Sequence, residues 1–249
     1  MSEFGDEPAD DFEAMKRATP ARLGVGRAGP RYTTASMLAL RADHARAVDA
    51  VLTEVPRDWA KRNGLLEVHS EAGSRDEYLR FPERGRRLNA DSVAQLKRLR
   101  SSSRRTAKSS VLICVGDGLS STAVEKNAAR LLTSLNRVLG SRYSLMKPLF
   151  IRNARVRIED HLGEILRPDL IGIIVGERPG LATAESLSVY VIYRPTLNSL
   201  EPDRTVISNI HRGGIPIAEA ARKIAALIDD AIHFGATGAS LAAKISSRT

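Results

Sequence analysis

Cysteine, aromatic residues and long apolar runs are all scarce in this sequence. Cys114 is the single cysteine, which excludes an internal disulfide framework and any metal site built from several thiolates. No apolar run approaches the roughly 20 residues that a transmembrane helix needs. Aromatic residues make up only 4% of the chain, whereas proteins that bind single-stranded nucleic acid use aromatic side chains as stacking platforms. These absences favour a soluble intracellular protein without a membrane segment.

The charge of the chain is unevenly distributed. The formal net charge is +9, but residues 1–13 hold six acidic residues and no basic one, so the remainder is more basic than that figure suggests. Between Arg75 and Lys108 there are eleven bases against four acids. Such a surface attracts nucleic acid, a phosphate-bearing ligand or an acidic protein surface, or it is simply a solvated basic exterior. Charge alone does not decide between these alternatives.

The N-terminal part of the chain is predicted to be largely helical. Residues 1–19 are acidic and rich in small residues, which predicts a disordered segment. In the region 20–108, a helix capped by Thr34 is expected over 35–52, another helix over 89–100, and a linker over 101–105. The first helix has an apolar face formed by Leu38, Ala42, Ala45, Val48 and Leu52.

Strand and helix patterns alternate in the third part, residues 109–249. The apolar run 111–115 is typical of a buried central strand, and an amphipathic helix is expected over 120–139. Further strands are expected over 146–151, 154–158, 170–175 and 187–193, with helices over 159–166 and 217–233. The sequence therefore predicts an α/β fold, in which a helical N-terminal part precedes a C-terminal Rossmann-like sheet domain.

Two glycine-rich segments differ in their sequence context. Gly24–Gly29 matches the string G-x-G-x-x-G, but no strand precedes it, so a connecting loop is favoured over a dinucleotide site. Gly116–Thr122 lies between a buried strand and a helix, where free backbone N–H groups can face a ligand. The structural alternative for this second segment is a tight turn in which Asp117 or Ser120 caps the helix.

A third glycine-rich segment, Gly176-Glu-Arg-Pro-Gly180, directly follows the strand expected over 170–175. It holds Glu177 and Arg178 at the carboxyl end of the sheet, which is the edge where open α/β sheets bind ligands. The carboxylate can accept hydrogen bonds from hydroxyl or amide donors, and the arginine can meet a phosphate or carboxylate. An internal ion pair between these two side chains is the alternative.

No self-contained active site can be assembled from the sequence. None of the five histidines pairs with another at metal-ligand spacing, and the G-x-S-x-G nucleophile motif is absent. Cys114 lies inside an apolar run, which favours a buried, inert thiol. We therefore assign no catalytic residue and no metal ligand.

Taken together, the segments resemble the small (light) subunit family of ethanolamine ammonia-lyase. The resemblance covers roughly residues 20–235, with the matching strings in the family's order. They are Ala21-Arg-Leu-Gly-Val-Gly-Arg-Ala-Gly29, Asp43-His-Ala-Arg-Ala47, Pro82-Glu-Arg-Gly-Arg-Arg-Leu88, Asp117-Gly-Leu-Ser120, Gly176-Glu-Arg-Pro-Gly180, Glu185-Ser-Leu-Ser188 and Asp203-Arg-Thr-Val-Ile-Ser-Asn-Ile210.

The resemblance implies a heteromeric, adenosylcobalamin-dependent lyase of higher-order assembly. In this family a large TIM-barrel subunit holds the substrate, and ethanolamine becomes acetaldehyde and ammonia through cobalt–carbon bond homolysis and radical migration. The small subunit contacts the lower side of the cofactor and carries no reacting group. The resemblance also implies a cytoplasmic location, either in the free cytosol or inside a bacterial microcompartment.

Three cobalamin-binding positions of the family map onto Val156, Glu177 and Val206. Val156 is expected within a strand around Arg155-Val-Arg157, and the family commonly has cysteine where this chain has Val206, which keeps an apolar contact without sulfur. The D-x-H-x-x-G signature of base-off cobalamin proteins is absent, because Asp160-His-Leu-Gly163 has a different spacing. The resemblance thus implies base-on binding, in which the cofactor's benzimidazole stays the lower ligand of cobalt.

Two other functions are compatible with parts of the sequence. The arginines of 75–108 would suit a basic nucleic-acid-binding module, although no recognisable reading motif accompanies them. Asp117 and Glu177 would suit a stand-alone α/β enzyme. Binding to nucleic acid without affinity for cobalamin would favour the first, and turnover without a second chain would favour the second.

Overall fold

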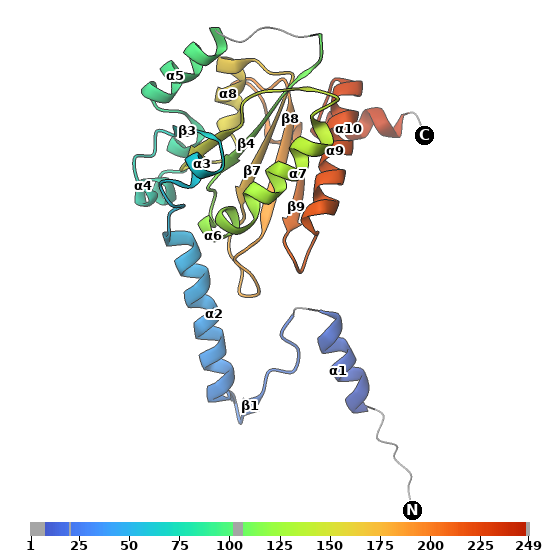
Figure 1. Cartoon of the computed structure of the whole chain (residues 1–249). Helices are drawn as coiled ribbons and strands as arrows, with labels where there is room; N and C mark the ends of the chain where they lie inside the picture. The colour runs from blue at the N-terminus through green and yellow to red at the C-terminus, as the bar shows by residue number, and fades with distance from the viewer. Residues whose placement is uncertain (1–7, 20, 102–106, 248–249) are drawn as a thin grey trace, which may run out of the picture.

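The computed structural model of the chain describes residues 8–19, 21–101 and 107–247 (Figure 1). The expected linker at 101–105 and the first seven residues of the acidic segment lie largely outside this description. The strands are β1 (Arg27–Ala28), β2 (Arg31–Tyr32), β3 (Leu66–His69), β4 (Ser110–Gly116), β5 (Ser144–Leu145), β6 (Leu149–Arg152), β7 (Leu170–Gly176), β8 (Leu187–Tyr193) and β9 (Thr205–Ile210). The α-helices are α1 (Pro8–Ala18), α2 (Thr34–Leu52), α3 (Trp59–Arg62), α4 (Arg75–Arg80), α5 (Ala90–Ser101), α6 (Ser121–Ala123), α7 (Ala129–Leu139), α8 (Ile158–Leu166), α9 (Ile217–Phe234) and α10 (Gly238–Ser246).

The fold is built on a mixed seven-stranded sheet, which confirms the α/β class. The strand order is β3-β6-β4-β7-β8-β9, and β5 pairs with the beginning of β4. Strands β3, β6, β4 and β7 are mutually parallel, whereas β8 is antiparallel to both β7 and β9. The carboxyl ends of β4, β6 and β7 therefore lie at one edge of the sheet.

Helices cover the sheet on both faces. Along β4, Val111, Ile113 and Val115 pack with the apolar sides of α7 and α9. Leu112 and Cys114, which alternate with them, pack with α5 and α8 on the other face. Burial on both faces explains why β4 is a continuous apolar run.

Several local predictions were confirmed, and others were wrong. Helix α2 is capped by Thr33, whose hydroxyl accepts from the N–H of Ser36, and not by Thr34. The helix expected over 120–139 forms as α6 and α7, joined by a π-helical turn at Val124–Ala128. The expected strand over 154–158 does not form; Asn153 has φ 57°, and the chain turns there into α8, so Val156 lies in a turn and not in a strand. Only the second half of the strand expected over 146–151 forms, as β6, and β5 lies just before the expected range. Strands β3 and β9 were not predicted, and β3 brings part of region 20–108 into the sheet.

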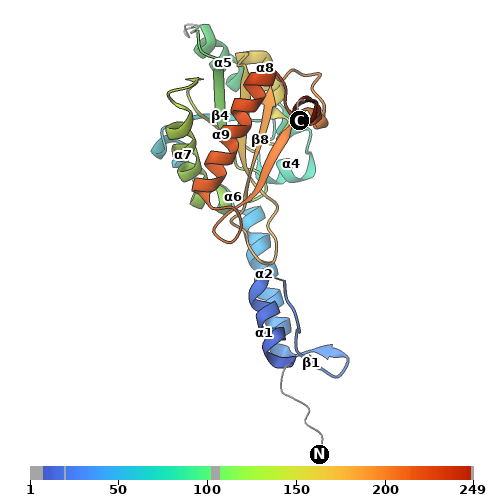
Figure 2. The ribbon, with the colours of Figure 1, turned by 90° about the vertical axis from the view of Figure 1, so that its right-hand side faces the viewer.

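The N-terminal elements leave the body at the carboxyl edge of the sheet. Figures 1 and 2 show α2 projecting from that end, with the hairpin β1–β2 at its far end. Residues 8–18 form α1, so the structure differs there from the expected disordered segment. Gly24–Gly29 lies in the exposed chain before α2, and no strand precedes it in residues 8–19 and 21–23. In the described part of the chain, no helix is both long and apolar enough to cross a membrane.

Candidate functional site

A cleft of about 370 Å³ opens at the carboxyl ends of the parallel strands. The loops that follow β4, β6 and β7 each contribute to it, and two residues of β8 complete its wall. The lining residues are Gly118, Leu119, Ala154, Arg155, Val156, Val175, Gly176, Glu177, Arg178, Ser188 and Tyr190. The two glycine-rich segments expected at this edge therefore meet in one place, and Val156 and Glu177 share the same cleft.

Direct backbone contact between two loops forms the floor of the cleft. The N–H of Leu119 donates to the carbonyl of Gly176 at 2.9 Å. Gly118 has φ 59°, and a Cβ atom added there would lie 2.4 Å from the carbonyl oxygen of Gly176. A Cβ added at Gly176 would lie 2.1 Å from the carbonyl oxygen of Ser120. Glycine is required at both positions because only bare backbone allows this approach.

Asp117 holds the turn that positions Val156. Its carboxylate accepts hydrogen bonds from the N–H groups of Asn153 (2.8 Å) and Ala154 (3.0 Å). Burial raises the pKa of Asp117, and the charge of Arg75 opposes that shift. The helix cap is instead Ser120, whose hydroxyl accepts from the N–H of Ala123. Asp117 is thus engaged by the backbone and inaccessible to a substrate.

Tyr78 lies between two arginines behind the cleft. The guanidinium carbon of Arg155 is 4.1 Å from the ring centroid, and that of Arg75 is 4.8 Å away. Arg155 also donates to the carbonyl of Tyr78 at 2.9 Å. Burial raises the pKa of Tyr78 to about 12. The Nε of Arg155 is buried and has no hydrogen-bond partner among the described residues, so a polar donor remains unused at the cleft wall.

Glu177 connects three strands at the edge of the sheet. Its Oε1 accepts from the hydroxyl of Ser188 on β8 (2.5 Å) and from the N–H of Asn209 on β9 (2.8 Å). The expected alternative, an ion pair with Arg178, is not formed between these two described residues, and Arg178 is exposed. Both hydrogen bonds use Oε1, so neither of them occupies the second carboxylate oxygen of this cleft-lining residue.

Val206 lies beside the cleft and does not line it. It is opposite Tyr190 in the β8–β9 register, so the two side chains share a sheet face. Tyr190 lines the cleft, and its pKa is raised by burial and by the charge of Glu177. Val206 is 46% exposed on the edge strand β9. The apolar surface therefore continues from the cleft across β8 to Val206.

A buried ion-pair network connects the turn of Val156 to the strand of Val206. Arg204, at the entry to β9, pairs with Glu159 at 3.1 Å and with Asp160, both in the first turn of α8. All three side chains are nearly inaccessible, and burial raises the pKa of Glu159 well above its usual value. One oxygen of Glu159 has no partner among the described residues. Sequence reasoning missed this network because its members are 44 and 45 positions apart.

Most of the arginines between 75 and 101, the part of this basic region before the gap in the described residues, are engaged within the chain. Arg75 is buried and donates to the carbonyls of Val51, Gly118 and Leu119. Arg80, Arg84 and Arg87 lie near acidic side chains, and Arg100 donates to the carbonyl of Ile165. These arginine contacts give no support to a continuous nucleic-acid-binding surface.

In the described part of the chain, no group of three metal-ligating side chains is present.

Comparison with known proteins identifies similar chains. The sequence profile of the "Ethanolamine ammonia-lyase light chain" family matches residues 9–242. The "Ethanolamine ammonia-lyase small subunit" of Fusobacterium nucleatum is 44% identical over 233 residues, which cover 93% of this chain and 77% of that protein. The protein of the same name from Clostridioides difficile is 43% identical over 235 residues, or 94% and 78% of the two chains.

Proposed function

The chain belongs to the ethanolamine ammonia-lyase light-chain family, and on that basis we propose that it holds the lower side of adenosylcobalamin against a catalytic large subunit. The lyase would convert ethanolamine to acetaldehyde and ammonia, with the substrate bound by a TIM-barrel large subunit in a higher-order hetero-oligomer. This small subunit would work in the cytoplasm, either free or inside a bacterial microcompartment. The observation that carries the proposal is the meeting of Val156 and Glu177 in one cleft, with Val206 next to it.

The residues of the cleft fit the chemistry of this cofactor. A corrin is a flat apolar macrocycle fringed with amide groups, and it carries a phosphate–ribose–benzimidazole tail. Val156, Tyr190 and Val206 offer an apolar surface of matching character. Glu177 offers an acceptor to an amide or ribose hydroxyl, and the unpartnered Nε of Arg155 offers a donor to the phosphate.

The chain's own residues would bind and orient, and they would perform no chemistry. Bound adenosylcobalamin supplies radical chemistry, and the protein determines its position and surroundings. The two valines would exclude water from the lower side of the ring. Glu177 is held by Ser188 and Asn209, so its carboxylate presents a fixed oxygen to a donor on the cofactor.

Base-on binding is supported by the surroundings of His161. Its Nδ1 accepts a hydrogen bond from the N–H of Leu88 at 2.9 Å, and its pKa is lowered by burial. This contact holds α8 against the chain near β3, and His161 is not among the residues that line the cleft. The cleft lining contains no histidine that could reach cobalt, so the cofactor would retain its own benzimidazole.

Replacing Glu177 tests the proposal. In the assembled enzyme we expect Glu177→Ala to weaken adenosylcobalamin binding about 10- to 100-fold, because a hydrogen bond to a desolvated donor is lost. Equilibrium dialysis of the cofactor against the purified complex measures this change. Glu185→Ala is the matched control, since that carboxylate lies on the same loop and pairs with Lys126 at the surface.

One further measurement, the thermal stability of the complex, makes the result decisive. Thermal melting of the complex shows whether the loss of the contacts with Ser188 and Asn209 has unfolded the edge of the sheet. Cofactor affinity that is equal in Glu177→Ala, Glu185→Ala and the unmodified complex would refute the assignment of Glu177.

A further inference from the structure

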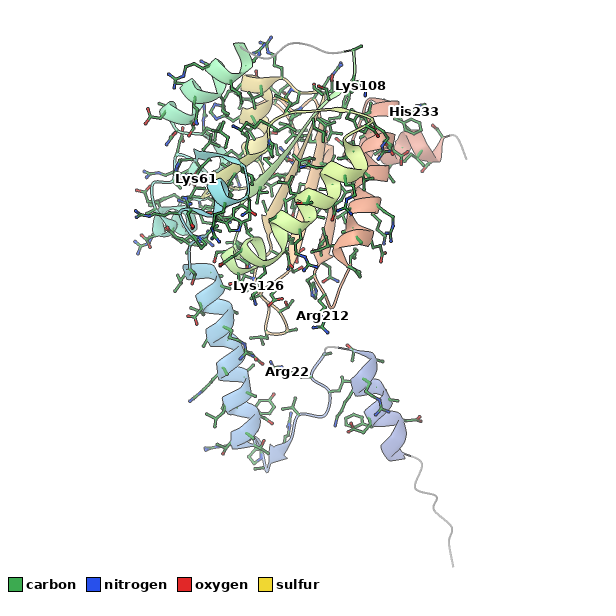
Figure 3. All side chains as sticks on the ribbon, in the orientation of Figure 1. Arg22, Lys61, Lys108, Lys126, Arg212 and His233 are labelled. Carbon is green, nitrogen blue, oxygen red and sulfur yellow. The ribbon has the colours of Figure 1, made fainter. Side chains whose placement is uncertain are left out.

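Helix α4 lies at the end of the body where α2 joins it (Figure 1). Lys126 and Arg212 mark this end of the body in Figure 3. The first residue of α4 is Arg75, and only 6% of it is exposed. Arg75 is not among the residues that line the cofactor cleft. Its side chain therefore lies behind the proposed cofactor site and is not part of its surface.

Arg75 supports the loop that carries Glu177. Its three nitrogens donate to three backbone carbonyls, those of Val51 (2.7 Å), Gly118 (2.8 Å) and Leu119 (3.1 Å). Two of these residues, Gly118 and Leu119, line the cleft. The N–H of Leu119 donates in turn to the carbonyl of Gly176, directly before Glu177. A planar guanidinium can meet several carbonyls at once because its donors have a fixed geometry, which the ammonium group of lysine lacks.

The same guanidinium is the counter-charge of Asp117. Nη1 of Arg75 lies 4.0 Å from Oδ2 of Asp117, and both side chains are buried. Both oxygens of this carboxylate accept hydrogen bonds, Oδ2 from the N–H of Asn153 and Oδ1 from the N–H of Ala154. Val156 follows in the same turn. Protonation would make one of the two oxygens a donor, so this pair of hydrogen bonds needs the ionised carboxylate.

Arg75 also favours the ionised form of Asp117. Burial raises the pKa of Asp117, and the charge of Arg75 is the largest influence that opposes the shift. Two other titratable side chains interact with this carboxylate. Arg152 of β6 also lowers its pKa, and Tyr78 of α4 has its own pKa raised in part by the charge of Asp117. Without Arg75, the pKa of Asp117 would rise further, and the carboxylate would take up a proton at a higher pH.

We propose that Arg75 is a positioning residue for the cofactor site, acting through Asp117 on the turn of Val156 and through the loop after β4 on Glu177. This inference rests on the proposed function, in which Val156 and Glu177 contact the cofactor. Arg75 and Asp117 would touch no cofactor atom. A flat macrocycle needs its contacts placed relative to one another before it binds, and one buried side chain here supports two of them.

The test measures the affinity of the assembled enzyme for adenosylcobalamin by equilibrium dialysis from about pH 8 to about pH 6. We expect Arg75→Met to weaken binding about 10-fold at the upper end of this range, because the loop after β4 loses its shared donor. The loss should grow as the pH falls, because Asp117 then becomes protonated. Arg80→Met is the matched control, since Arg80 is exposed on the same helix and pairs with Asp76 at the surface. Its affinity should stay within about twofold of the unmodified complex.

Asp117→Asn isolates the role of the carboxylate. This variant is neutral and of nearly the same size, and it leaves the three carbonyl contacts of Arg75 in place. We expect it to weaken binding about 10-fold at every pH in the range, because an amide offers a single acceptor oxygen to the N–H groups of Asn153 and Ala154. In the double variant, Arg75→Met with Asp117→Asn, the additional loss at lower pH should disappear, because this position no longer titrates.

The pH dependence separates a positioning role from a merely structural one. A ratio of affinities between Arg75→Met and the unmodified complex that is the same at every pH would overturn the proposal. If Arg75→Met does not assemble with the large subunit, Asp117→Asn decides alone, and an affinity equal to that of the unmodified complex would overturn the proposal. Failure of the proposed function is distinguishable, because the unmodified complex would then bind no adenosylcobalamin at any pH.

Discussion

Helices α2 and α9 both carry an apolar side at helical spacing, and only α9 buries it within this chain. In α9, the residues Ala220, Ala221, Ile224, Ala225, Ile228 and Ala231 are buried against the sheet and α7. In α2, the corresponding stripe from Leu38 to Leu52 is exposed. This comparison shows that an apolar helical pattern predicts that one side of a helix will be buried. The pattern does not predict whether the same chain or another chain covers that side.

The ion pairs of the same two regions also differ in how deeply they are buried. In the body, Arg204 and its partners Glu159 and Asp160 are almost fully buried. In the N-terminal part, Asp43 of α2 pairs with Arg22 and Arg46, whose side chains are 39% and 68% exposed. Removing one buried partner leaves an uncompensated charge, whereas an exposed charge is solvated again by water.

The largest contrast is expected from arginine substitutions. Arg204→Met should lower the free energy of unfolding by about 3–5 kcal/mol, because buried Glu159 loses its counter-charge and Asp160 keeps only its pair with Arg157. Arg22→Met, the matched change in the N-terminal part, should cost less than about 1 kcal/mol. Chemical denaturation of both variants measures the difference. Equal costs would mean that the two ion-pair networks are buried to the same degree.

A smaller contrast is expected from truncating apolar side chains in the two helices. Ile224→Ala should cost about 2–4 kcal/mol, because it leaves a cavity between α9 and the sheet. Leu38→Ala should change the stability of the isolated chain by no more than about 0.5 kcal/mol. The same denaturation experiment applies. A cost for Leu38→Ala close to that of Ile224→Ala would show that α2 is already covered in the isolated chain.

The continuous and strongly periodic segments of the fold were predictable from the sequence. The run from Val111 to Val115 needs burial on both faces, and the pattern of 217–233 suits a single helical face. Short segments were not predictable in this way. The alternation of 154–158 suggested a strand. The N–H groups of Asn153 and Ala154 instead donate to the carboxylate of Asp117, and the backbone turns there into α8. A long-range contact of this kind overrides the local pattern.

The site was partly predictable for the same reason. Glycines after buried strands indicated the correct edge of the sheet, so the segments containing Asp117 and Glu177 were placed there. The partners of Glu177 could not be found from the sequence, because Ser188 and Asn209 approach it through strand pairing. Strand β9 itself was missed, since Thr205–Ile210 mixes polar and apolar residues on an exposed edge. Tyr190 could likewise not be found from the sequence, because strand pairing brings it to the cleft and opposite Val206.

The most direct measurement is a structure of the assembled enzyme with adenosylcobalamin bound. We expect the lower side of the corrin or its nucleotide tail to contact Val156 and Val206 within about 4 Å, and Glu177 to accept a hydrogen bond of about 2.7–3.2 Å from the cofactor. A cofactor that lies away from all three residues, with the cleft at the carboxyl edge of the sheet left open to solvent, would contradict the account.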